Sequence, residues 1–266
     1  MATETRFAFG KNWAKYLAVS SNKEILEKSK KSLNDFLAGY LLKGKTFLDF
    51  GSGSGVHSLA ALSLGASKVA SIDFDDDSVA CARHLKEKSQ SSNWEIKQGS
   101  LLDENLIKSL GQFDVVYCWG VAHHTGDMAK ALENLEKLIA PRGLLFLAIY
   151  NKVEGKLGSR YWWHIKRFYN ESGFIVKKIM ETAYLAYNFL MLVARFKNPL
   201  RVFSEYKKKR GMSWSTDLID WLGGFPYEYA SVKEIFDLYH GKYGMELLNI
   251  KTTNYTGCNQ FLFSKK

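Results

Sequence analysis

The sequence is poor in cysteine, with only Cys81, Cys118 and Cys258 in 266 residues. An odd and scattered set excludes a disulfide framework and provides no Cys-x-x-Cys metal pair. The histidines lack a spacing such as His-Glu-x-x-His, so we predict no metal site. A long hydrophobic run is missing too. The longest apolar stretch, 183–194, is broken by Asn188 and is too short to span a bilayer.

The N-terminus also lacks the basic-then-apolar layout of a signal peptide, so we expect a cytoplasmic protein. The chain is basic, with 37 Lys and Arg against 27 Asp and Glu, a formal net charge of +10. This balance permits binding to nucleic acid, anionic lipid or an acidic substrate. A solvated basic surface explains it equally well, because the densest run, 207–210, is short. Charge by itself therefore selects no function.

From residue 45 onward, short apolar strands alternate with helical segments. Nearly all-apolar strands separated by helices indicate a parallel sheet covered on both faces, and right-handed crossovers make it a Rossmann-like, doubly wound α/β sandwich. The last two strands, 245–251 and 260–263, are joined by a short loop and must pair as an antiparallel hairpin. The sequence thus predicts a mostly parallel seven-stranded sheet. The five strands that precede the hairpin are expected at 46–50, 68–74, 94–98, 113–118 and 143–150.

A long segment, 152–228, separates the fifth strand from the last helix. It is rich in aromatic residues and too regular in pattern to be a loop, so we expect a helical insertion. It is either a cap that closes an acceptor pocket, which we favour, or a packed structural addition. Its helical stretch 174–196 could rest on a membrane surface, although core burial is the simpler explanation. The chain divides into an N-terminal extension or lid at 1–44, a core at 45–151, this cap, and a C-terminal helix and hairpin at 229–266.

The N-terminal extension contains an amphipathic helix at 22–39, preceded by four aromatic residues. The aromatic residues either fold over the ligand as a lid or pack against that helix. They are Phe7, Phe9, Trp13 and Tyr16.

The strongest local signal is the stretch DFGSGSG at 49–55, which follows a strand and opens a helix. Glycines there allow a sharp turn and a close approach to a ligand, and a helix N-terminus attracts a carboxylate or phosphate. A dinucleotide fingerprint, G-x-G-x-x-G, would need glycine where Val56 stands, so the spacing disfavours NAD. Asp73 ends the second strand, where a carboxylate can accept hydrogen bonds from ribose hydroxyls. A role in capping the next helix is the alternative.

Four motifs in order resemble a known family. The G-x-G-x-G loop preceded by Asp49 resembles motif I of class I S-adenosylmethionine (SAM)-dependent methyltransferases. QGSLLD, at 98–103, stands where family members often have Gly-Asp. CWGVAHHTGD, at 118–127, resembles the L-H-H-x-x-D segment of the type 11 and type 12 methyltransferase families, and APRGLLFLAIYN, at 140–151, resembles their fifth-strand motif. The similarity covers roughly 45–151 and the terminal hairpin.

This resemblance implies a class I methyltransferase that uses SAM and releases S-adenosylhomocysteine (SAH). Leu101 would pack on the adenine ring, with Ser100 or Asp103 near the exocyclic amine. His57 would line the cofactor pocket rather than ionise. The residues implied to bind the cofactor are Asp49, Gly51, Ser52, Gly53, Gly55, His57, Asp73, Phe74, Ser100, Leu101, Trp119 and Gly120.

Methyl transfer from a sulfonium is a direct displacement, so the protein mainly aligns donor and acceptor. A hydroxyl acceptor must also lose its proton, and a histidine with a pKa of about 6.5 suits that step. We hypothesise that His123 or His124 is the base, although either one could instead brace the loop by hydrogen bonding. The family geometry places four residues at the acceptor: Tyr150, Trp214, Tyr255 and Asn259.

The acceptor itself falls into one of three classes. O-methylation of a small-molecule, glycan or lipid-linked acceptor fits the His-His segment and the aromatic insertion, and peripheral membrane contact would suit a lipid-linked one. An RNA- or protein-modifying enzyme would fit the basic charge, but CWGV stands where amino-methylating nucleic-acid enzymes carry N/D-P-P-Y/F. A non-catalytic SAM-binding protein is the third class, because fold does not fix function. We favour the first.

Overall fold

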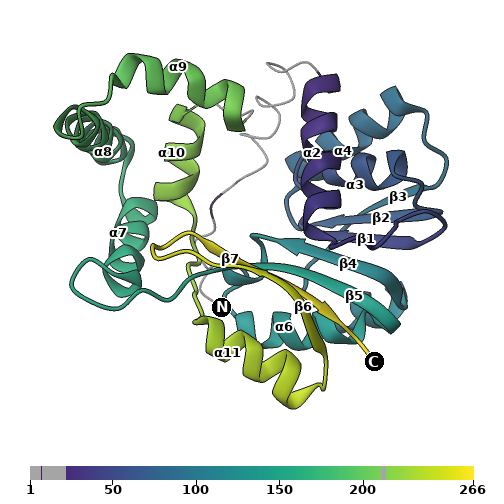
Figure 1. The fold of residues 1–266 in the computed structure, drawn as a ribbon. Helices are drawn as coiled ribbons and strands as arrows, with labels where there is room; N and C mark the ends of the chain where they lie inside the picture. The colour runs from purple at the N-terminus through teal and green to yellow at the C-terminus, as the bar shows by residue number, and fades with distance from the viewer. Residues whose placement is uncertain (1–6, 8–21, 211–213) are drawn as a thin grey trace.

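The computed structural model describes residue 7 and residues 22–210 and 214–266, and a seven-stranded sheet runs through its centre (Figure 1). The strand order is β3-β2-β1-β4-β5-β7-β6. The first five strands are parallel, and β7 pairs antiparallel with both β5 and β6. This arrangement confirms the predicted fold. The strands are Thr46–Phe50 (β1), Lys68–Asp73 (β2), Trp94–Gln98 (β3), Phe113–Trp119 (β4), Ile139–Tyr150 (β5), Glu246–Lys251 (β6) and Cys258–Ser264 (β7).

Two separate apolar cores cover the two faces of the sheet. Neighbouring strand residues point to opposite sides, so Phe47 joins one core while Leu48 joins the other. Helices α2, α3 and α4 pack on the first face, and α6 and α11 lie across the second (Figure 1). The helices of the core are Asn22–Phe36 (α2), Val56–Ser63 (α3), Asp76–Ser89 (α4), Glu104–Leu110 (α5), Met128–Lys137 (α6) and Val232–Phe236 (α11), which continues as a π-helix, Asp237–Lys242.

Side chains in the loops fix where several of these helices begin. The carboxylate of Asp75 accepts the backbone N–H of Ser78 at the start of α4. At the start of α11, Ser231 and Glu234 form a reciprocal capping box. Such caps satisfy backbone N–H groups that have no partner within the helix. The loop residues therefore set the helix positions at the edge of the sheet.

The fifth strand differs from the prediction. It starts at Ile139 instead of residue 143, and its pairing with β4 jumps from Phe113 opposite Ile139 to Val115 opposite Leu144. The segment 139–143, most of which was expected to precede the strand, thus forms a bulge inside it. Gly143 is required there, because a Cβ on it would lie 2.8 Å from the carbonyl oxygen of residue 140.

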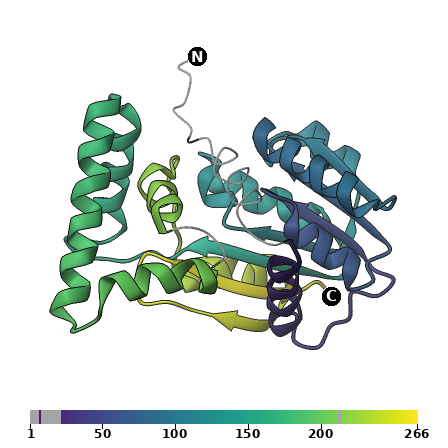
Figure 2. The ribbon, with the colours of Figure 1, turned by 90° about the horizontal axis from the view of Figure 1, so that it is seen from above.

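The insertion folds as four helices that gather beyond the carboxyl end of β5 (Figures 1 and 2). A small apolar cluster built on Tyr169, Leu218 and Leu222 holds them together. In the described part of the chain, no helix is both long and apolar enough to cross a membrane. The four helices are Ser159–Glu171 (α7), Phe174–Ala194 (α8), Pro199–Arg210 (α9) and Trp214–Gly223 (α10).

Core burial is the wrong explanation for the apolar composition of α8. This helix has no buried residue, and large apolar side chains such as Ile175 (73 % exposed) and Leu190 (66 %) face solvent. Both views place α8 on the outer side of the cap, away from the sheet (Figures 1 and 2). The helix therefore has too few neighbours to cover its apolar residues.

Because the cap has a core of its own, damage to it should stay local. We expect Leu222→Ala, which opens a cavity in the cap cluster, to accelerate amide hydrogen exchange across α7–α10 and leave β1–β5 protected. Leu48→Ala, in the central strand, should instead lower the free energy of global unfolding by about 2–5 kcal/mol. Exchange followed by mass spectrometry compares the two variants, and equal acceleration in the sheet and the cap would contradict the independence of the cap.

Candidate active site

A single cleft opens at the carboxyl ends of the central strands and extends under the cap. Ligands bind at this edge of open α/β sheets, where the strand order reverses, here between β1 and β4. The cleft volume is ≈ 1970 Å³, against about 300–1,000 Å³ for a pocket that holds one small ligand. There is room for a cofactor and an acceptor together.

Asp73 ties the glycine loop to the end of β2 and also lines the cleft. One carboxylate oxygen accepts the backbone N–H of Gly53 at 2.8 Å, and the other accepts that of Asp75 at 3.0 Å. Burial raises the pKa of Asp73, and the two N–H donors act against that rise. The cap of α4 is Asp75. Asp73 is therefore available to a ligand through its remaining lone pairs, while it holds the loop in place.

The glycines of the loop serve two different purposes. A Cβ on Gly51, which has a φ of 77°, would lie 2.1 Å from a methyl of Val121, so glycine lets the loop after β4 close on the cleft. Gly55 does not line the cleft. A Cβ there would lie 3.0 Å from both Ala82 and Trp94, so Gly55 allows α3 to pack closely against its neighbours. Of the predicted cofactor glycines, Gly51, Gly53 and Gly120 line the cleft.

A buried chain of hydrogen bonds stands behind the loop. The Ser58 hydroxyl donates to Asp49 at 2.6 Å and lies 2.6 Å from the Ser71 hydroxyl, which accepts the indole N–H of Trp94 at 2.7 Å. All four residues are buried. Removal from water disfavours the charged form of Asp49 and raises its pKa to about 7.

Other predicted cofactor residues complete this end of the cleft. His57 stacks on Tyr117 with ring centres 5.1 Å apart, and burial lowers its pKa to about 4, so the ring is neutral at pH 7. Phe74 and Trp119 line the cleft with half-exposed aromatic rings. The Ser52 hydroxyl is buried without a hydrogen-bond partner among the described residues. The unsatisfied Ser52 hydroxyl and the exposed rings of Phe74 and Trp119, beside the carboxylate of Asp73, fit an adenosyl group with its ribose.

The loop after β3 separates two residues that the sequence left as alternatives near the adenine. Ser100 and Leu101 line the cleft, whereas Asp103 does not. The Asp103 carboxylate accepts the backbone N–H groups of Asn105 and Leu106, at 2.9 and 3.2 Å, and so begins α5. Of the two, only Ser100 is left as a candidate for the contact with the adenine amine.

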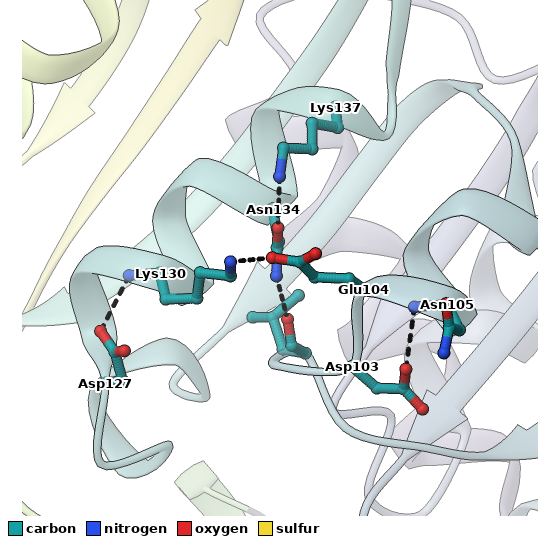
Figure 3. A network of polar contacts seen from close by, with 8 residues as sticks. Asp103, Glu104, Asn105, Asp127, Lys130, Asn134 and Lys137 are labelled. Atoms are coloured by element: carbon teal, nitrogen blue, oxygen red, sulfur yellow. Dashed lines mark hydrogen bonds and ion pairs between the residues drawn. The ribbon is translucent and has the colours of Figure 1, made fainter.

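Polar contacts with α6 hold this loop from behind (Figure 3). The buried side chain of Asn134 donates to the carbonyl oxygen of Leu101 at 2.9 Å and accepts from Lys137 at 2.8 Å. Lys130 pairs with Glu104 beside it. The network fixes the backbone of Leu101, and thus the side chain that faces the cleft.

The two histidines lie in a short 3₁₀ turn after β4 (Ala122–His124), and the backbone assigns their tautomers. Nδ1 of His123 accepts the N–H of Tyr150 at 3.2 Å, so its proton is on Nε2, which is buried without a partner among the described residues. Nδ1 of His124 lies 2.6 Å from the carbonyl oxygen of Pro226 and must donate, which places the lone pair on Nε2. Burial lowers the pKa of His124 to about 3 and that of His123 well below its usual range.

Beyond the histidines, Tyr150 of β5 and Trp221 of the cap line the cleft as an aromatic wall, and the sequence predicted only Tyr150 as a site residue. Trp221, Tyr227 and Tyr150 surround the ammonium of Lys166, 4.0, 4.9 and 5.8 Å from their ring centres. Lys166 is fully buried and donates to the carbonyl of Trp221, and burial lowers its pKa to about 7. The one signal was a lysine within the aromatic stretch 161–169.

The predicted acceptor residues separate into two groups. Tyr150 and Trp214 line the cleft, and Tyr255, 71 % exposed, lies at its rim. Asn259 does not line it. Its buried amide donates to Asn151 at 2.9 Å and accepts a backbone N–H of the loop before β7 at 3.0 Å. Asn259 thus holds the hairpin loop in place, and a direct contact with the acceptor would require this arrangement to change.

Of the predicted aromatic lid, only Phe7 falls within the described residues. Its ring lines the cleft and packs over Gly223, where a Cβ would lie 2.2 Å from it. Its backbone N–H donates to the carbonyl of Phe225 at 3.1 Å. Phe7 therefore contacts the cap. Phe9, Trp13 and Tyr16 lie outside the described residues.

Comparisons with known proteins agree with this geometry. Residues 41–212 match a family described as a methyltransferase domain. The ubiquinone biosynthesis O-methyltransferase of Pseudomonas paraeruginosa is 35 % identical over 112 residues, which are 42 % of this chain and 47 % of that protein. A ribosomal protein methyltransferase of Photobacterium profundum is 31 % identical over 128 residues, 48 % of this chain and 41 % of that protein. The chain thus spans about half the length of these curated relatives.

Among solved structures, magnesium protoporphyrin IX methyltransferase from Synechocystis, with bound SAH, has the same fold. Its TM-score is 0.55 at 14 % sequence identity, and the match covers 96 % of this chain and 94 % of that one. The likeness extends over the cap as well as the core.

If Asp73 binds the ribose, its charge should matter more than its shape. We expect Asp73→Asn to weaken SAH binding at least about tenfold, because a hydrogen bond to a charged group contributes about 1.5–3 kcal/mol. Titration calorimetry with SAH measures the change. Asp103→Asn is the matched control, because that carboxylate caps α5 outside the cleft, and its affinity should be unchanged. If Asp73→Asn binds SAH as tightly as Asp103→Asn does, Asp73 has no role in binding the ribose.

Asp49 should make stability fall as pH rises. The native carboxyl keeps its proton up to about pH 7, whereas the unfolded chain releases it near 3.8. The native state therefore binds more protons between these values, and rising pH costs stability there, by up to about 1.4 kcal/mol for each unit. Asp49→Asn should flatten this dependence in urea unfolding of the ligand-free protein. The exposed Asp35→Asn on α2 is the control, and an unchanged slope for Asp49→Asn would contradict the raised pKa.

Proposed function

The chain belongs to the methyltransferase domain family, with SAM as the cofactor that this family and the fold indicate, and on this premise we propose that it methylates a hydroxyl oxygen of a small aromatic or lipid-linked acceptor. The observation that carries the proposal is the continuous cleft. It runs from the glycine loop and Asp73, past the buried His123 and the half-buried His124, to the aromatic wall of Tyr150 and Trp221.

The cofactor end and the acceptor end have distinct chemistry. When bound, SAM supplies an electrophilic methyl group on a sulfonium. Asp73, Ser52 and the backbone of the glycine loop hold the adenosyl part, with Leu101 beside the base. The rings of Tyr150 and Trp221 orient the acceptor and exclude water, and positioning of this kind lowers a displacement barrier by about 7–11 kcal/mol.

The tautomers divide the work between the two histidines. His124 is the base in this proposal, because its Nε2 carries the lone pair that takes the acceptor proton while the oxygen–carbon bond forms and the sulfur–carbon bond breaks. His123 carries its proton on Nε2, which has no partner among the described residues, and in this proposal it donates that proton in a hydrogen bond to the acceptor oxygen and so fixes its position. The depressed pKa values keep both rings neutral at pH 7, which is the form that both roles require.

We expect His124→Ala to lower kcat by a factor of about 10²–10⁴, which is the usual contribution of a general base. The affinity for SAH should be unchanged. His123→Ala should cost less, about tenfold, as the loss of one hydrogen bond. The exposed His164→Ala on α7 is the control. The measurement is transfer of a labelled methyl group to catechols that carry alkyl chains of increasing length. Wild-type turnover by His124→Ala would exclude it as the base.

The pH profile separates a buried base from an ordinary one. Protonation removes the base as pH falls through the pKa of His124, which burial lowers to about 3. The acid limb of kcat/KM should therefore lie well below pH 6. A limb at about 6.5, the ordinary pKa of histidine, that disappears in His124→Ala would contradict the burial of this group in the free enzyme.

A second candidate is methylation of a protein or an RNA. The net charge of +10 and the likeness to a ribosomal protein methyltransferase favour it. The same assay with total ribosomal protein and total RNA decides between the candidates. Labelled macromolecule with steep salt dependence would replace the small acceptor, because phosphate contacts are released by salt.

A further inference from the structure

The outer face of α8 is a continuous apolar stripe that nothing in the described structure covers. Ile175, Ile179, Ala186, Leu190 and Val193 recur at spacings of three, four and seven, so they share one face of the helix. The four larger side chains are 49–73 % exposed. A shallow apolar groove runs along the first half of this stripe. Large exposed apolar patches of this kind mark surfaces of interaction.

The opposite face of the same helix belongs to the active-site cleft. Tyr184 and Asn188 line it, and Tyr184 packs on Trp162 of α7 with ring centres 5.7 Å apart. One helix thus separates the acceptor end of the cleft from the outside of the molecule. Trp162 in turn packs on Trp221 of the aromatic wall, with ring centres 4.9 Å apart, so the face opposite the stripe is linked to the wall.

The end of α8 carries a second unusual feature. Phe196 has a φ of 56° and is fully exposed. It occupies the left-handed position of a Schellman motif, in which the N–H of Lys197 bonds to the carbonyl of Leu192 and that of Phe196 to Val193. Glycine is the usual residue there, because a bulky side chain strains this conformation. The chain therefore tolerates strain in order to present an aromatic ring to the outside.

The charge around the stripe distinguishes between possible occupants. Residues 174–201 include five basic side chains and one acidic one, Glu181. Glu181 is not on the outer face, since it is half-buried and accepts from the Tyr169 hydroxyl at 2.9 Å and from Lys178 at 2.6 Å. Because Lys178 is paired with Glu181, the positive charge of this stretch is concentrated at the C-terminal end of α8, around Arg195 and Lys197. Two copies of α8 packed in parallel would set these positive ends against each other, whereas phosphate groups would complement them.

We propose that α8 docks on the surface of an anionic phospholipid bilayer. The stripe and Phe196 enter the boundary between headgroups and acyl chains, while Arg195 and Lys197 contact the phosphates. The helix has 21 residues and lies along the surface. This inference rests on the proposed function for its purpose, since docking brings the aromatic wall next to a bilayer in which an apolar acceptor would be dissolved.

Co-sedimentation with vesicles tests the docking. The full chain should bind vesicles of phosphatidylcholine mixed with phosphatidylglycerol, and bind phosphatidylcholine alone far more weakly. Ile179→Gln with Leu190→Gln should lower the partition coefficient at least about tenfold, because these apolar side chains no longer enter the bilayer. Leu41→Gln is the matched control, as an exposed leucine (77 %) outside the cap. SAH affinity equal to that of wild type shows that each variant is folded.

Phe196→Gly separates a role in binding from a role in folding. Glycine relieves the left-handed strain, so the midpoint of thermal unfolding should rise by about 2 °C. Vesicle binding should nevertheless fall severalfold. A structural role for the ring would lower the midpoint instead, and that result with unchanged vesicle binding would count against the docking.

Two further outcomes are decisive. Equal binding of wild type and the Ile179→Gln, Leu190→Gln variant overturns the proposal. So does a wild-type dimer in analytical ultracentrifugation that this variant converts to monomers, because the stripe is then a contact between copies. Failure of docking and failure of methyl transfer can be told apart. Asp73→Asn should keep vesicle binding after SAH binding is lost, and the stripe variant should keep methylating a water-soluble catechol.

Discussion

One buried hydrogen-bond chain, from Trp94 through Ser71 and Ser58 to Asp49, anchors the cofactor end of the protein. It joins β3, β2, α3 and β1, the elements that meet around the glycine loop. A carboxyl group in this position is tolerated only because a hydroxyl donates to it and because its pKa is raised to about 7. These hydrogen bonds fix the position of the carboxyl end of β1. The positions of the glycine loop, of Asp73 and of the start of α3 depend in turn on where β1 ends.

The loop in turn determines where the loop after β4 can lie. Val121 occupies the space that a side chain on Gly51 would fill, so the His-His turn approaches the cofactor end at this point. The turn is then held by backbone groups from two other regions, the N–H of Tyr150 in β5 and the carbonyl of Pro226 at the end of the cap. The tautomer of His124 therefore depends on the cap being in place, whereas that of His123 is set by β5.

The cap has solvent-exposed apolar side chains on its outer side and aromatic side chains on the side that faces the cleft. Its small internal core leaves α8 supported on one side only, so the helix serves the cleft with one face and presents the other to the surroundings. Lys166 shows the same division within the cap. Its aliphatic stem and ammonium fill the space between three rings, where burial lowers its pKa to about 7.

The sequence by itself determined the features that depend on residues close together in the chain. Apolar strands alternating with helices specify the doubly wound sheet, and the glycine spacing, Asp73 and the adjacent histidines lie within single loops that follow those strands. Tertiary structure decided the rest, because it depends on residues far apart in the chain. Pro226 selects the protonated nitrogen of His124, and Asn151 commits Asn259 to holding a loop instead of facing a ligand. The exposure of α8 was also decided by the tertiary structure. Whether an apolar helix is buried depends on how many other elements pack against it, and the sequence of the helix itself does not specify that number.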